Sequence, residues 1–192
     1  MSLKIRNSNR TAARHAQLGF MLVEVMVSMV ILMVGLVTLL GVFSLALATT
    51  QTAQQDMIAK QLASEAMESI VTARQTTQLP WSSVQNVSAG GIFSDGFKSI
   101  QNAGANGVAG TTDDTGARTL TLPGPDGVVG TSDDISLPLT NYQRQIAITA
   151  VTDSSGNILT DLRSVTITVQ YAVPRTSIKK NYVLTSYISQ YR

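Results

Sequence analysis

The longest apolar stretch of the chain lies near its start, over residues 20–48. Of these 29 residues 23 are apolar, and the only charged one is Glu24. About 20 apolar residues are enough to cross the roughly 30 Å of hydrocarbon in a bilayer, and a helix of this stretch would be about 44 Å long. The pattern therefore predicts a membrane-spanning helix in contact with lipid.

The helical pattern continues over residues 49–76, now with a single narrow apolar face. From Ile58 to Ile70 an apolar residue recurs every four positions, with polar side chains between. This spacing is typical of a helix that packs one face against a protein core. Because Pro80 cannot continue a helix, we expect the helix to end at about Thr76.

The second half of the chain changes to an alternation of apolar and polar residues, which is typical of half-buried β-strands. The clearest alternating runs lie at residues 145–152, 164–173 and 181–191, and a turn sequence at 153–157 separates the first two. Consecutive runs of this kind predict a three-stranded antiparallel meander. Residues 81–115 form a long glycine-rich connector, which we expect to be a functional loop region or to contain short strands.

Together these patterns predict an α+β protein. Its long N-terminal helix, half in a membrane and half amphipathic, would pack on a C-terminal antiparallel β-sheet head with glycine-rich acidic loops. The expected divisions are a leader at residues 1–19, the membrane helix at 20–48, the amphipathic helix at 49–76 and the head at 77–192.

Composition and charge narrow the function. Only 14% of the residues are charged, against about 25% in ordinary soluble domains, and the chain has no cysteine and a single histidine, His15. This excludes disulfides, thiolate metal sites and histidine triads from the body of the chain, so we expect no enzymatic activity. Four of the 14 basic residues precede residue 20, which leaves 10 against 12 acidic ones. Without a basic stripe, we expect no nucleic-acid binding.

The basic residues also orient the membrane helix. Four of them lie within the first 14 residues, and none follows the apolar run before Lys60. Because positive charge stays on the cytoplasmic side, we expect a single-pass protein with a cytoplasmic N-terminus. The alternative is a secretory signal cut after Ala48, which would release a soluble domain, although the apolar core of such signals is only about 7–15 residues long.

The junction before the apolar run carries a further motif. Gly19 and Phe20 are followed by Glu24, the fifth residue of the run, and then by an uninterrupted apolar segment. This combination closely resembles the class III signal of type IV pilins and pseudopilins, and residues 30–36 most resemble minor pilins of the pilus-modification type. The resemblance covers residues 18–73 and implies nothing specific about the head.

The resemblance implies a route of processing and assembly. A prepilin peptidase would cut after Gly19 and methylate the new N-terminal amine of Phe20, and Glu24 would pair with such an amine during filament assembly. The implied partners are this peptidase, other pilin subunits, an inner-membrane assembly platform and membrane lipid. The implied location is the bacterial inner membrane and then a periplasmic or cell-surface filament. A minor pilin, a major pilin and a pseudopilin of type II secretion remain open.

An acidic repeat is the other distinctive feature. Residues 104–114 recur as residues 124–134, with seven of eleven positions identical. Each copy combines glycines, a hydroxyl side chain and carboxylates, which are features of loops that bind calcium through oxygen ligands. The candidate calcium ligands are Asp126, Asp133 and Asp134 in the second copy, and Asn106, Asp113 and Asp114 in the first.

The second copy also resembles the calcium loop of the major pseudopilins of type II secretion. Asp126 and Asp133 fit the layout of that loop, whereas Asp134 departs from it because the family separates its later acidic residues by one position. The alternative is that both copies are ordinary surface turns, which aspartate and asparagine side chains commonly cap.

Overall fold

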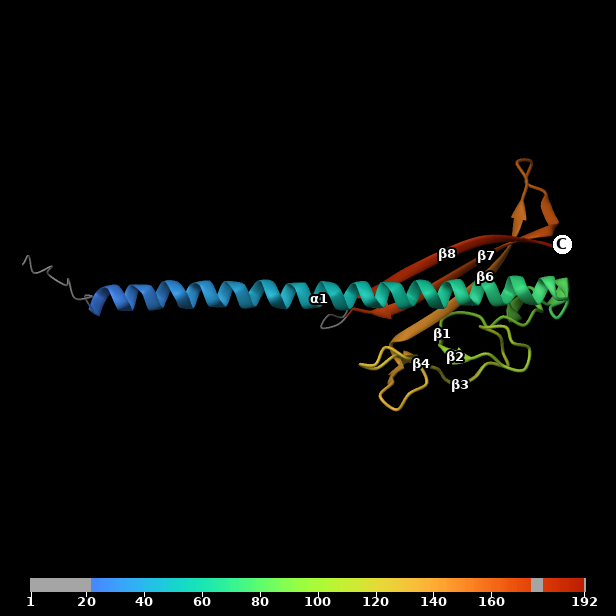
Figure 1. The fold of residues 1–192 in the computed structure, drawn as a ribbon. Coiled ribbons are helices and arrows are strands. Elements are labelled where there is room, and N and C mark those ends of the chain that lie inside the picture. Colours follow the sequence, from blue (N-terminus) through green and yellow to red (C-terminus); the bar gives the residue numbers. More distant parts are fainter. Residues whose placement is uncertain (1–21, 174–177, 192) are drawn as a thin grey trace, which may run out of the picture. The chain divides into compact units, whose positions relative to one another are not determined.

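The computed structural model describes residues 22–173 and 178–191 (Figure 1). Its first element is a single helix, α1 (Leu22–Gln75), which is 54 residues long. The residue contacts divide the chain between Ala46 and Leu47 into two compact units. The second unit holds the rest of α1 and all the strands.

The first unit consists, in its described part, of the beginning of α1. All its described residues are exposed, including the long run of valine, leucine, isoleucine and methionine side chains. The described residues include one helix that is long and apolar enough to cross a membrane. Soluble monomers rarely expose such a continuous apolar surface, which is typical of sites that contact a membrane or another protein.

In the second unit α1 buries one face. The buried positions recur with helical spacing, as the sequence predicts: Ile58, Ala59, Leu62, Ala63, Ala66, Met67, Ile70 and Ala73. The helix ends one residue before the predicted position. Beyond it, Thr77 has a left-handed backbone with φ of 65°, and the amide of Leu79 donates to the carbonyl of Ala73 over 3.0 Å. Pro80 then keeps the chain from resuming the helix.

The main sheet has four antiparallel strands in the order β1-β6-β7-β8. Three of them, β6 (Tyr142–Thr152), β7 (Ile158–Ala172) and β8 (Lys179–Ser189), form the predicted meander and lie side by side in Figure 1. The prediction of three strands was incomplete, because the two-residue strand β1 (Lys98–Ser99) pairs with the start of β6. A strand of two residues is too short to show an alternation of apolar and polar positions.

Four short strands form two further sheets, each a separate antiparallel pair. One pair is β2 (Gln101–Asn102) with β3 (Thr115–Ala117), and the other is β4 (Thr119–Leu122) with β5 (Ile135–Pro138). The first acidic repeat connects β2 to β3, and the second connects β4 to β5. Short 3-10 helices complete the unit, at η1 (Trp81–Ser83), η2 (Val87–Ala89) and η3 (Leu139–Asn141).

The connector after α1 is held to the sheet by Arg163 of β7. Its guanidinium lies 4.2 Å from the ring centroid of Trp81, and its Nη1 donates to the carbonyls of Trp81 and Val84 over 2.6 and 2.7 Å. A guanidinium over an indole face gains cation–π attraction as well as hydrogen bonds. The only tryptophan of the chain therefore lies in a defined environment in the head.

Candidate functional site

Glu24 lies in the first turn of α1, with its residue exposed. Among the described residues no side chain pairs with its carboxylate, and its backbone carbonyl accepts a hydrogen bond from Ser28 Oγ over 2.8 Å. A carboxylate at the start of an apolar helix can take a cationic partner. The predicted cleavage and methylation positions, Gly19 and Phe20, lie outside the described residues.

The two acidic repeats have the same loop structure. In each, the seventh residue, Gly110 or Gly130, donates its amide to the last aspartate over 2.6 Å. A threonine hydroxyl donates to the first aspartate of the pair, over 2.5 Å in the first copy and 2.6 Å in the second. The side chain at the third position, Asn106 or Asp126, accepts from the amide two residues later in both copies. Equivalent sequences thus build equivalent local structures.

The glycine that opens each copy is required by close packing. A Cβ atom on Gly104 would lie 2.4 Å from the carbonyl oxygen of Asp113, and one on Gly124 would lie 2.3 Å from that of Asp133. These distances are too short for any side chain, and the obstacle includes backbone. Each loop therefore closes tightly on its own start, and this explains why the glycine occurs at the same place in both copies.

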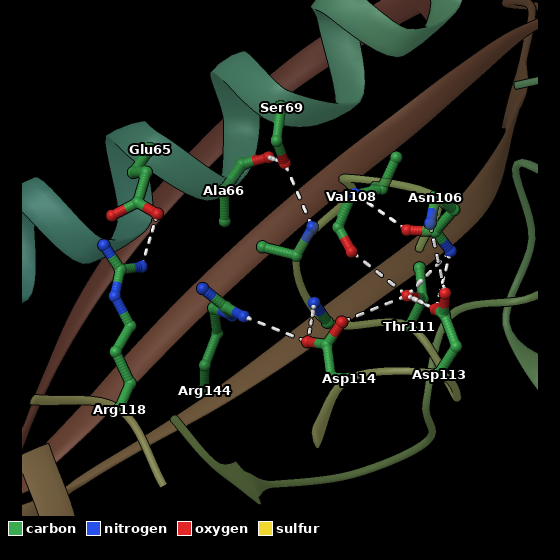
Figure 2. A network of polar contacts seen from close by, with 12 residues as sticks. Glu65, Ala66, Ser69, Asn106, Val108, Thr111, Asp113, Asp114, Arg118 and Arg144 are labelled. Atoms are coloured by element: carbon green, nitrogen blue, oxygen red, sulfur yellow. Dashed lines mark hydrogen bonds and ion pairs between the residues drawn. The ribbon is translucent and has the colours of Figure 1, made fainter. Parts of the chain in front are cut away.

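The surroundings of the first copy are protein on several sides (Figure 2). Val108 and Ala109 are 1% and 4% exposed and belong to the core that α1 helps to form. The amide of Ala109 donates to Ser69 Oγ of α1 over 3.2 Å. The tip of this loop is thus part of the core, whereas the sequence predicts only a calcium loop or a surface turn.

A buried arginine completes the first copy. Arg144 of β6 is 5% exposed, and its Nη2 lies 3.8 Å from the Oδ2 atom of Asp114, whose side chain is also 5% exposed. Burial lowers the pKa of Arg144, and the Asp114 charge opposes that shift. The pairing explains how the chain tolerates both charges, since a buried ion without a partner is costly. Figure 2 shows the two side chains facing each other.

Arg144 was absent from the predicted site, although the sequence contains a signal for it. In β6 the alternation places this residue on the same face as Tyr142 and Ile146, both of which are buried. A charged residue at an inward position of a strand needs a partner of opposite charge. The sequence cannot identify that partner, because Asp114 is 30 positions away along the chain.

The second copy has no comparable surroundings among the described residues. Val128 and Val129, which correspond to the buried Val108 and Ala109, are 55% and 60% exposed. No arginine or lysine lies within ion-pair distance of Asp134 in the described part of the chain. Its Oδ1 atom is buried without a hydrogen-bond partner. The second loop therefore has the structure of the first but lacks the contacts that the first makes with α1 and β6.

The carboxylates of both copies are turned toward hydrogen-bond donors of their own loop. The hydroxyl of Thr111 is the main cause that lowers the pKa of Asp113, and Thr131 lowers that of Asp133 in the same way. Over residues 22–173 and 178–191, no three acidic or histidine side chains gather in a group that could hold a metal ion. Calcium binding stays a prediction, and would require the carboxylates of the second copy to exchange these donors for the ion.

Three further polar contacts tie α1 to the rest of the unit. Tyr171 of β7 donates its hydroxyl to Asp56, which also lies 3.7 Å from the amine of Lys180, and Arg118 pairs with Glu65. Burial, followed by the Asp56 interaction, raises the pKa of Tyr171. These contacts join α1 to β7, β8 and the segment before β4.

No family model matches the chain, and neither a curated protein nor a solved structure does so.

Proposed function

We propose that the protein is a structural subunit, most similar to a minor pilin, of a type IV pilus or a related envelope filament. The observation that carries the proposal is the combination of the Gly19–Phe20 junction, Glu24 and the apolar part of α1. That part of the helix has no protein around it in the described chain, so it needs either lipid or the helices of other subunits.

In this proposal, cleavage after Gly19 leaves the apolar helix on the mature protein with a new amine at Phe20. The subunit waits in the inner membrane, with its N-terminus cytoplasmic, and then moves into a filament whose core is made of such helices. Glu24 pairs with an N-terminal amine there. A lone carboxylate or ammonium is costly in an apolar core, and the two cost less together.

A pseudopilin of type II secretion is the second candidate. The acidic loop at residues 124–134 favours it, because that loop resembles the calcium loop of those proteins. The secreted-domain alternative places its cut after Ala48, a residue that lies inside α1. The three candidates share the absence of an enzymatic role and differ in the mature N-terminus or in the partner machinery.

Mass spectrometry of the native N-terminus tests the proposal. We expect a methylated Phe20, and a start at Thr49 would refute it in favour of the secreted domain. Glu24→Ala should still be cleaved but should be depleted from sheared filaments, because the amine loses its partner. Ser28→Ala, one turn away, is the matched control and should be incorporated normally. Normal incorporation of Glu24→Ala would contradict the assigned pairing.

A further inference from the structure

We propose that the tip of the second acidic loop, formed by Val128, Val129 and Asp134, is a docking surface for another protein. The partner would present a helix face of small and hydroxyl-bearing side chains next to an arginine. The inference does not depend on the filament proposal. The molecule contains two copies of one loop, of which the first packs against the rest of the protein and the second does not.

The comparison is valid because the two loops have the same structure. The amide of the third residue donates to the first aspartate of the pair over 3.2 Å in each copy. The threonine hydroxyl oxygen lies 3.0 Å from the carbonyl oxygen of the fifth residue in the first copy and 3.1 Å from it in the second. The groups that the first loop presents to its surroundings are therefore presented in the same arrangement by the second.

The docked loop shows which chemistry this arrangement accepts. Val108 and Ala109 lie in the core, against a stretch of α1 that contains alanines. Ser69 accepts the Ala109 amide, and Arg144 neutralises Asp114. Figure 2 shows Ser69 and Ala66 on α1 on one side of the loop and Arg144 on another. The loop thus makes apolar contacts at its tip, a hydrogen bond from the Ala109 amide and an ion pair at Asp114.

In the undocked loop, each of these groups lacks its counterpart among the described residues. Val128 and Val129 are more than half exposed, and the Val129 amide has no counterpart of Ser69 among the described residues. The Oδ2 atom of Asp134 keeps the bond from Gly130, but no arginine or lysine of the described residues lies within ion-pair distance of it, whereas the Oδ2 atom of Asp114 lies 3.8 Å from Arg144. Two adjacent exposed valines beside a carboxylate without an ionic partner in the described residues match the apolar centre and charged rim of a protein interface.

Two other occupants of the second loop, a further copy of this chain and an anionic lipid surface, are excluded. In a second copy of this chain, the surface around Ser69 and Arg144 is already filled by that copy's own first loop. An anionic lipid surface would repel the aspartates of the second loop. A different protein can satisfy all three groups at once. Small side chains on its helix would cover Val128 and Val129, a hydroxyl would accept from the Val129 amide, and an arginine would pair with Asp134.

The absence of cysteine from the chain makes the test direct. In the full chain, Val129→Cys introduces a single thiol whose size is close to the alanine at position 109, so it should not prevent docking. Its rate of reaction with a maleimide is measured for the purified protein in detergent and in permeabilised cells that produce the protein naturally. We expect labelling in cells to be about tenfold slower, which corresponds to about 1.4 kcal/mol of protection.

Control variants separate docking from general crowding. Ser155→Cys, in the exposed turn between β6 and β7, should react at the same rate in both settings. Adding Asp134→Asn to Val129→Cys should restore fast labelling in cells, whereas adding Glu68→Gln, which neutralises an exposed carboxylate on α1, should not. Equal rates for Val129→Cys in the two settings, or equal protection of Ser155→Cys, would overturn the proposal. Protection that Asp134→Asn leaves intact would exclude arginine, and protection that a calcium chelator removes would identify an ion instead.

Discussion

The two acidic loops allow one substitution to be compared at a docked and at an undocked position. Val108→Ala removes two carbons from a side chain that is 1% exposed, and Val128→Ala removes the same atoms from one that is 55% exposed. At about 0.8 kcal/mol per buried methylene, plus a term for the cavity, the first change should cost about 2 kcal/mol of unfolding free energy. The second should cost less than about 0.5 kcal/mol, as is usual at the surface.

Urea unfolding of the full chain in a non-ionic detergent measures this difference. The single tryptophan, Trp81, reports on the head because it stacks on Arg163. With a denaturant slope of about 2 kcal/mol per molar, Val108→Ala should lower the midpoint by about 1 M, and Val128→Ala by less than about 0.25 M. Equal shifts for the two variants would refute the assignment of one loop to the core and the other to the surface.

The remaining predictions concern the charges of the two loops. Arg144→Met should lower the unfolding free energy by about 3 kcal/mol in the same urea assay, because it leaves a buried carboxylate without its partner; a neutral result would mean that the pair is solvated. Since the pKa of Asp113 is lowered in the folded state, its stabilising contribution is present above the ordinary value of 3.8 and is lost as the pH falls through the lowered one. Thr111→Val removes the main cause, so the Asp113 pKa measured by carboxyl NMR should rise; no change would show that the hydroxyl contributes nothing. Millimolar calcium should raise the melting temperature of the head relative to chelator, by an amount that Asp126→Ala with Asp133→Ala abolishes, and about 2.7 kcal/mol is available at a hundred times the dissociation constant. A melting temperature indifferent to calcium would leave the second loop an ordinary turn.

Much of the fold could be predicted because its signals are local. The recurrence from Ile58 to Ile70 identifies the buried face of α1, and alternation identifies β6, β7 and β8 to within a few residues. The predicted strand at 164–173 nevertheless began too late, since β7 (Ile158–Ala172) starts six residues earlier. Its first residues alternate less clearly and pair across an irregular register near Ala150.

The surroundings of the acidic loops could not be predicted, because they depend on contacts between distant parts of the chain. Seven identical positions in eleven produce one loop structure twice, but nothing within either copy says which one α1 will cover. In the first copy Val108 and Ala109 lie in the core to which α1 contributes, and Asp114 lies close to Arg144 of β6. Sequence similarity here predicts conformation and leaves the environment undetermined.

The separate pairing of β4 with β5 has a consequence for how such a chain can change during evolution. These strands hydrogen-bond to each other and to no strand of the main sheet, and the same is true of β2 with β3. The loop between β4 and β5 can therefore change while the strand order β1-β6-β7-β8 is preserved, whereas Leu120 and Leu137 of the two strands pack against the core and are constrained. Surface variation can accumulate in residues 124–134 at little cost to folding, because Val128 and Val129 are exposed there while Val108 and Ala109 of the first loop preserve the packing against α1.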